Sequence, residues 1–181
     1  LILGTVPMVN GDRLIFNHGI PLESLETRVP ISPPSQAHTV FATDGSQIAP
    51  SHHEIAYCYL INIGRVMLHY GQSLHPLLDH LPEIFYRSED LYTSRKWGIR
   101  TDEWLGYRRT ASEAEVLAEM ACKWVLPPGA HGHIPNVAMV DGSLVYWFLE
   151  NLPAEARQQI LEPLLGAWQQ LRETRIPLIG Y

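Results

Sequence analysis

The chain has 181 residues, of which 46% are hydrophobic and 18% are charged, a composition that indicates a globular protein of about one domain. No apolar run approaches the roughly 18 residues that span a membrane. Acidic residues outnumber basic ones by 19 to 13, and the net charge of −6 argues mildly against nucleic-acid binding, although acids that hold divalent cations contribute to this total.

The cysteines and the two ends of the chain bear on the cellular compartment of the protein and on the completeness of the domain. Cys58 and Cys122 lie within apolar patterns and form no C-x-x-C motif, so we expect buried thiols in a reducing, cytoplasmic compartment. The opening Leu-Ile-Leu-Gly does not resemble a secretory signal. The chain starts without Met and ends in an apolar, strand-like run, and we therefore expect a domain truncated at its C-terminus.

The first half of the chain is expected to be an arm followed by strands. Residues 1–37 are rich in Pro, Gly and polar residues and predict an irregular arm and linker, followed by one domain over 38–181. Residues 38–43 predict a strand that ends at Asp44. Residues 55–63 and 65–70 predict two more strands, joined by a hairpin at Asn62-Ile63-Gly64. Residues 71–107 predict short helical pieces and loop.

The second half alternates helices and strands. Residues 110–126 predict a helix that Thr110 or Ser112 caps and that Pro127-Pro128-Gly129 ends. Residues 136–140 predict a strand, 153–174 a helix and 176–179 a final strand. This order predicts an α/β fold with a ribonuclease H-like mixed sheet, in which a three-strand antiparallel meander precedes alternating helices and strands.

One informative motif occurs twice. Asp-Gly-Ser follows an apolar run at Asp44 and again at Asp141. A carboxylate at the end of a buried strand is costly unless a cation or hydrogen bonds compensate it, and Gly lets the backbone turn or approach a ligand closely. Two such acids side by side make an oxygen site suited to Mg²⁺ or Mn²⁺, which can activate water for phosphodiester cleavage.

Two other interpretations of the repeat remain open. Asp, Gly and Ser are all turn residues, so each motif is also compatible with a simple turn. Aspartic proteases pair two acids as well, but their motif has Thr or Ser between Asp and Gly, and their fold is almost wholly β. The predicted helices around Asp141 disfavour that class.

Further residues resemble a known family, the NurA nucleases. The resemblance covers roughly residues 35–181. It is carried by Ala42-Thr43-Asp44-Gly45-Ser46-Gln47-Ile48, His53-Glu54, Tyr59–Gly64, Tyr107-Arg108-Arg109 through Glu113 and Leu117, Val140-Asp141-Gly142-Ser143-Leu144, and Ile176-Pro177-Leu178-Ile179-Gly180-Tyr181.

The resemblance implies a Mn²⁺-dependent deoxyribonuclease that digests DNA from 5′ ends and cuts single strands. It also implies a homodimer and a HerA-type hexameric translocase as partner in DNA end resection and repair. Family members place acids on the first strand, the following helix and the fourth strand. They add a tyrosine and a histidine from a later segment, which this sequence does not extend to.

Helical periodicity selects an acid for the third position. Glu113 lies one turn before Leu117 on the apolar face that also holds Met120, Ala121 and Trp124, whereas Glu115 and Glu119 fall on other sides. We therefore predict Asp44, Glu113 and Asp141 as catalytic residues and metal ligands. A Glu favoured by the helix dipole near the N-terminus is the alternative account of Glu113.

Weaker candidates complete the set. Arg95, Lys96, Arg108 and Arg109, with Trp97, Trp104 and Tyr107 nearby, form the densest basic and aromatic stretch and are candidates for holding single-stranded DNA, or an ordinary packed charge cluster. The pairs His52-His53 and His131/His133 lack metal-ligand spacing. The alternative to a nuclease is a catalytically inactive ribonuclease H-like module that binds nucleic acid or a partner.

Overall fold

The computed structural model describes residues 3–4, 18–19, 24, 26–33, 35–51 and 57–181. The chain divides into two compact units, Leu1–Pro34 and Ser35–Tyr181. In the first unit, β1 (Leu3–Gly4) pairs antiparallel with β2 (His18–Gly19). The predicted site residues all belong to the second unit.

The second unit is built on a five-stranded mixed sheet. Its strands are β3 (His38–Ile48), β4 (Tyr59–Tyr70), β5 (Leu77–Phe85), β6 (Asn136–Val140) and β7 (Leu178–Gly180), in the order β5-β4-β3-β6-β7. The first three form an antiparallel meander, β6 runs parallel to β3, and β7 runs parallel to β6. The predicted fold class, an α/β ribonuclease H-like sheet with a meander before alternating helices and strands, is confirmed.

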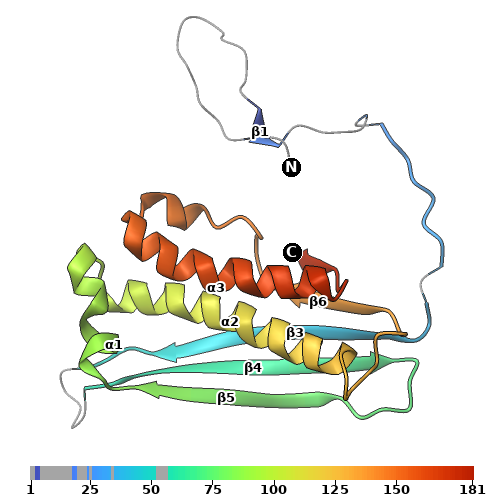
Figure 1. Cartoon of the computed structure of the whole chain (residues 1–181), viewed down its shortest axis with the longest axis horizontal. Helices are drawn as coiled ribbons and strands as arrows, with labels where there is room; N and C mark the ends of the chain where they lie inside the picture. Colours follow the sequence, from blue (N-terminus) through green and yellow to red (C-terminus); the bar gives the residue numbers. More distant parts are fainter. Residues whose placement is uncertain (1–2, 5–17, 20–23, 25, 34, 52–56) are drawn as a thin grey trace, which may run out of the picture. The chain divides into compact units, whose positions relative to one another are not determined.

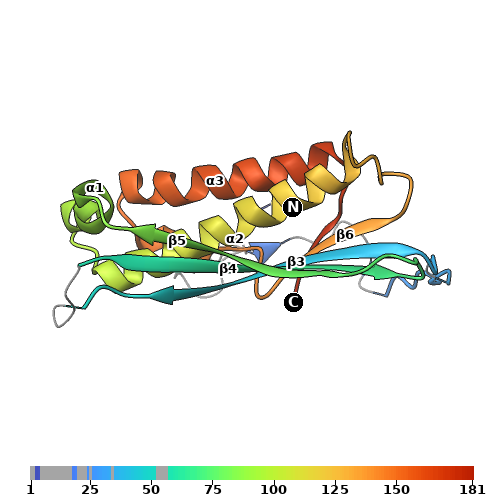
Figure 2. The same ribbon diagram turned by 90° about the horizontal axis from the view of Figure 1, so that it is seen from below.

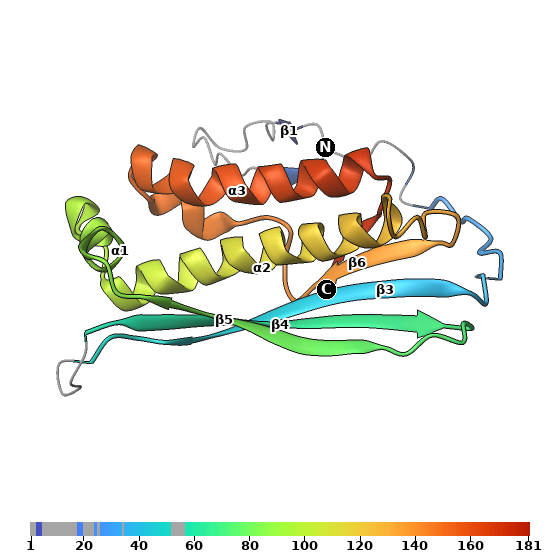
Figure 3. The same cartoon turned by 60° about the horizontal axis from the view of Figure 1, so that its bottom comes forward.

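The helices stack on one side of this sheet. α2 (Thr101–Val125) crosses the sheet over β3 and β4, and α3 (Ala154–Glu173) packs against α2 (Figures 1, 2 and 3). The short α1 (Ser88–Tyr92) and the 3₁₀ helix η1 (Thr93–Trp97) lead from β5 into α2, and a second 3₁₀ helix, η2 (Trp147–Asn151), precedes α3. No helix in the described part of the chain is long and apolar enough to cross a membrane.

A stripe of small residues explains why α2 fits between the sheet and α3. Ala111, Ala114, Ala118 and Ala121 follow the three- and four-residue spacing of one helix face, and all four are buried. Leu117 fills the same layer and is fully buried. The main core also contains Phe41, Met67 and Ala138 from the sheet and Ile160, Leu164, Ala167 and Leu171 from α3.

The predicted meander contained two errors. The hairpin at Asn62-Ile63-Gly64 is wrong, because β4 runs through these residues and Gly64 pairs with Asp44 on one side and His80 on the other. Residues 71–107 were predicted without a strand, yet β5 lies at Leu77–Phe85. The spacing of the apolar residues in β5 also suits a helix, which is why the strand was not predicted. Pro82 is tolerated because β5 is an edge strand.

Two predicted boundaries were also wrong. β3 does not end at Asp44 but continues to Ile48, because β4 supplies a backbone partner for every residue through the Asp-Gly-Ser motif. α2 begins at Thr101 rather than near Thr110, so neither Thr110 nor Ser112 caps it, and the cap residue Arg100 makes no side-chain cap hydrogen bond. Strand β6 occupies the predicted residues 136–140.

Candidate carboxylate site

The sheet brings the two Asp-Gly-Ser motifs to neighbouring strands. β3 and β6 pair in parallel, and the last pair in register is Ala42 with Met139. Asp44 and Asp141 each lie two residues beyond that pair, Asp44 inside β3 and Asp141 directly after β6. Because β6 ends at Val140 while β3 continues to Ile48, this edge of β3 is free of β6 beside the two acids.

The third acid comes from the middle of α2. Thr43 faces this helix, and its hydroxyl donates a 3.0 Å hydrogen bond to the backbone carbonyl of Glu113. The Glu113 side chain then lies over Gly45, where an added Cβ would collide with its Oε1 atom and would lie 2.7 Å from Cγ of Arg109. A glycine at this position therefore allows α2 to bring a carboxylate against the strand.

The three acids influence one another electrostatically. Burial raises the pKa of Glu113, the neighbouring Arg109 opposes this shift, and the charges of Asp44 and Asp141 raise the pKa further. A hydrogen bond from the Gly45 backbone N–H to the Glu113 carboxylate lowers it. The helix acid therefore lies within reach of the charges of both motif acids, in a partly desolvated place where a cation would be stabilised.

The carboxylates are nevertheless not gathered into a ready coordination group. Thr43 and Gly45 face α2, so strand alternation directs Asp44 between them to the opposite face. Within the residues that the structure describes, no three His, Cys, Asp or Glu side chains are close enough to hold a metal ion. The chemistry of the donor set, three carboxylates, fits a hard cation such as Mn²⁺ or Mg²⁺.

Glu113 acts electrostatically on a tyrosine, Tyr146, that was not predicted from the sequence. Tyr146 lies on the loop after Asp141, and its ring meets Phe148 edge-on at 5.9 Å, while Phe148 stacks on Tyr107 of α2 at 4.7 Å. Burial raises the pKa of Tyr146, and the charge of Glu113 adds to this effect. The side chain of Trp168 opposes this shift, and the net raised pKa keeps the phenol protonated.

Comparison with known proteins identifies the family. The model of the NurA domain matches residues 38–181. The chain belongs to the NurA family. A solved structure to which this chain is similar is the NurA nuclease from Sulfolobus solfataricus, at 14% sequence identity and a TM-score of 0.36, covering 75% of this chain and 44% of that one.

A second solved structure is also similar to this chain. The prototype foamy virus protease-reverse transcriptase matches at 18% identity and a TM-score of 0.36, covering 94% of this chain and 21% of that one. The search of curated protein sequences found no match. The NurA-family chain thus spans less than half the length of the NurA nuclease structure.

Glu115 and Glu119, the two glutamates that follow Glu113 on α2 of the NurA-family chain, lie away from Asp44 and Asp141. Glu119 is exposed and pairs with Lys123 one turn later. Glu115 is exposed and lines a cavity together with Arg108. Partial burial raises the pKa of the Glu115 carboxyl, and the charge of Arg108 opposes this shift with a smaller effect. The charges of Asp44 and Asp141 raise the pKa of Glu113, whereas neither acid is among the causes of the shift at Glu115.

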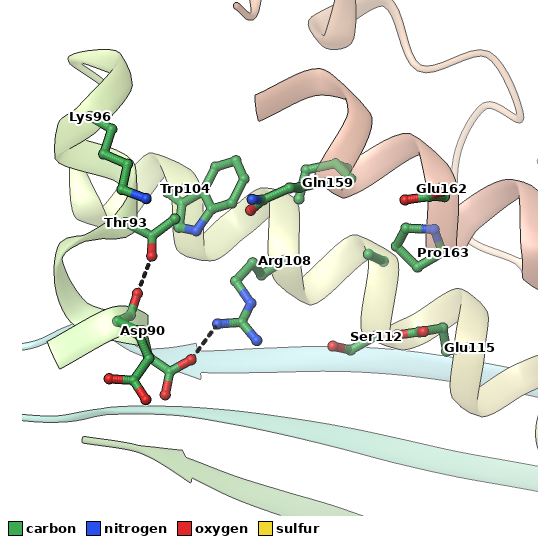
Figure 4. A pocket seen from close by; sticks show the side chains of 13 residues that line it. Asp90, Thr93, Lys96, Trp104, Arg108, Ser112, Glu115, Gln159, Glu162 and Pro163 are labelled. Carbon is green, nitrogen blue, oxygen red and sulfur yellow. Dashed lines mark hydrogen bonds and ion pairs between the residues drawn. The ribbon is translucent and has the colours of Figure 1, made fainter. Parts of the chain in front are cut away.

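The four basic candidates of the NurA-family chain do not form one patch. Arg95 lies over the Tyr92 ring at 4.4 Å. Lys96 and Arg108 line a cavity of about 510 Å³ between α1, η1, α2 and α3 (Figure 4), where Arg108 donates to Tyr59 at 2.6 Å and to Asp90 at 3.2 Å. Arg109 alone adjoins the carboxylates, with Nε 3.3 Å from Oε1 of Glu113.

The histidine candidates contribute no metal site in the described residues. His131 stacks on Trp124 with ring centres 3.8 Å apart, and His133 lies beyond it. His52 and His53 fall outside the described residues.

Gly45 offers a direct test of the packing between α2 and β3. The substitution Gly45→Ala is expected to displace the Glu113 carboxylate and the Arg109 stem, at a cost of about 1–3 kcal/mol in the free energy of unfolding. Chemical denaturation measures this. The matched control is Gly166→Ala in α3, where an added Cβ meets nothing within 4 Å, so the helix should be stabilised instead. Equal effects of the two changes would contradict the described packing.

Proposed function

We propose that this chain is the catalytic part of a metal-dependent deoxyribonuclease that hydrolyses phosphodiester bonds. The observation that supports this most strongly is the pairing of β3 with β6, which puts the two Asp-Gly-Ser acids on neighbouring strands, with Glu113 in electrostatic contact with both. Membership of the NurA family supports the same activity.

In this proposal Asp44, Glu113 and Asp141 are the ligands of Mn²⁺ or Mg²⁺. The cation supplies the activation of a water molecule and the neutralisation of charge that develops on the phosphate. The chain supplies the arrangement, because Thr43 and Gly45 fix α2 against β3 and so set the position of Glu113. The Tyr146 hydroxyl is a hydrogen-bond donor for a phosphate oxygen at the same place. No covalent intermediate is required.

The finer assignments follow the family resemblance. We propose digestion from 5′ ends, endonuclease activity on single strands, a homodimer and a HerA-type hexameric translocase as partner in DNA end resection and repair, in the cytoplasm. The assignment of Mn²⁺ as the preferred ion belongs to the same group of proposals. Arg95 and Lys96 are then secondary contacts to DNA. Lys96 lines the cavity of Figure 4, where Arg108 is already engaged by Tyr59 and Asp90.

A catalytically inactive module with the same fold is the second candidate. The observation that favours it is that the described carboxylates form no ready coordination group. Such a module would bind DNA or a partner through the same surface without cleaving a phosphodiester bond.

The experiment that separates these functions is a nuclease assay of the full-length protein on end-labelled linear and single-stranded DNA. We expect fragments to appear with Mn²⁺ and cleavage to stop when a chelator is added, because in this mechanism the cation activates the water molecule. DNA that is retained in a gel-shift assay but stays intact with Mn²⁺ would favour the inactive module, and cleavage that persists in chelator would exclude the metal mechanism.

A further inference from the structure

Arg109 is the basic residue that contacts the carboxylate site. It lies one helical turn before Glu113 on α2, and its Nε atom is 3.3 Å from Oε1 of Glu113. Its NH1 group donates a 3.3 Å hydrogen bond to the backbone carbonyl of Gly45. The aliphatic stem of Arg109 crosses Gly45, where an added Cβ would lie 2.7 Å from Cγ and 2.9 Å from Cδ. The guanidinium is therefore held between α2 and β3.

The contact with Glu113 is electrostatic rather than a directed hydrogen bond. Nε of Arg109 is buried and makes no hydrogen bond to any described residue, although the Glu113 oxygen is 3.3 Å away. The side chain is 36% exposed, so solvent is near enough to receive the guanidinium if it leaves. A charge contact without a directed hydrogen bond is weaker than a bidentate pair and easier to replace.

The surroundings explain why a cation is retained at this position. Glu113 is partly buried, and the negative charges of Asp44 and Asp141 raise its pKa further, so a positive charge beside it stabilises the ionised carboxylate. Arg109 is the basic residue among the groups that act on Glu113. A divalent ion bound to Glu113 would meet the same guanidinium at close range, where two positive charges repel.

We propose that Arg109 is a counter-ion built into the carboxylate site. Its guanidinium contacts the Glu113 carboxylate in the metal-free chain and is displaced when a divalent cation binds. This inference rests on the proposed function, because it needs the site to bind a metal. Arg109 is a positioning residue in this scheme. Once released it remains beside the acids, where it carries a positive charge for the incoming phosphate.

The test is the affinity of the metal-free full-length protein for Mn²⁺, measured from the electron paramagnetic resonance signal of the free ion. In Arg109→Gln we expect the dissociation constant to fall by about tenfold, because a competing positive charge is gone. Arg109→Lys keeps the charge and should stay within about threefold of the wild type. Thermal unfolding checks that both variants are folded.

Arg108→Gln is the matched control. Arg108 is the neighbouring arginine on α2, but it contacts Tyr59 and Asp90 rather than Glu113, so its loss should leave the Mn²⁺ affinity unchanged. Equal or weaker Mn²⁺ binding by folded Arg109→Gln would overturn the inference, because the arginine would then orient Glu113 for the ion instead of competing with it. Wild-type protein that binds no Mn²⁺ would overturn the metal mechanism and this inference together.

Discussion

Replacement of Asp44 by Asn is expected to reduce DNA cleavage by the full-length protein by on the order of a thousandfold, while the fold is retained. Asp44 is an exposed residue inside β3, so its carboxylate supports no core packing. Asparagine keeps the shape of the side chain but lacks the negative charge that a divalent cation needs. Single-turnover kinetics on end-labelled DNA with Mn²⁺ measure the loss, and circular dichroism confirms the fold.

Ser46→Ala is the control for this change. Ser46 is the exposed residue two positions further along β3, on the same side of the strand, and we expect it to retain most of the activity. The Asn variant also removes one of the charges that raise the pKa of Glu113, so it should unfold at the same temperature as the wild type or slightly above it. Full activity in Asp44→Asn would rule out Asp44 as a ligand.

The second large effect is expected at Glu113 and not at the neighbouring glutamates. Glu113→Gln should lower the cleavage rate by on the order of a hundredfold or more, since its carboxylate lies against Gly45 within reach of Asp44 and Asp141. Glu115→Gln and Glu119→Gln should cost little, because their side chains are exposed on other sides of α2. The same kinetic assay ranks the three variants, and a larger loss at Glu115 or Glu119 would mean that the helix acid is misassigned.

Stability provides a readout of Glu113 that does not depend on catalysis. Its pKa in the folded chain is raised above the ordinary value of 4.5, chiefly by burial. At pH values between the ordinary pKa of the unfolded chain and the raised pKa of the folded chain, the folded state binds more protons than the unfolded state. The free energy of unfolding therefore falls as the pH rises through this window. Metal-free Glu113→Gln should therefore unfold at a higher temperature than the wild type at neutral pH. The difference should disappear below about pH 4.5, where Glu113 is protonated in both states.

Local sequence patterns predicted the elements that are bounded by clear signals. β6 follows a Gly- and Pro-rich loop, and α3 begins next to Pro153, so both appear within one or two residues of the prediction. β5 was missed because its leucines recur at a spacing that suits a helix as well as a strand, and only pairing with β4 decides between them. A tertiary partner here overrides local propensity.

The site was predictable to the extent that it depends on repetition and periodicity. The repeated Asp-Gly-Ser indicated neighbouring strands, and the apolar face of α2 selected Glu113. The ion pair of Arg109 with Glu113 and the position of Tyr146 were not foreseen. The i,i+4 spacing of Arg109 and Glu113 is visible in the sequence, but the placement of both side chains over Gly45 is a contact between residues more than sixty positions apart. No short-range pattern encodes that distance.

The parallel pairing of β3 with β6 has a consequence for the order of folding. β3, β4 and β5 are consecutive antiparallel strands and can pair soon after residue 85 is available, whereas β6 pairs with residues of β3 that lie 97 positions earlier, as Asn136 does with Thr39. Contacts at such sequence separation form slowly, because the entropy of loop closure must be overcome first. During synthesis the meander therefore carries Asp44 without Glu113 and Asp141, and a nascent chain at this stage holds one of the three acids of the carboxylate site.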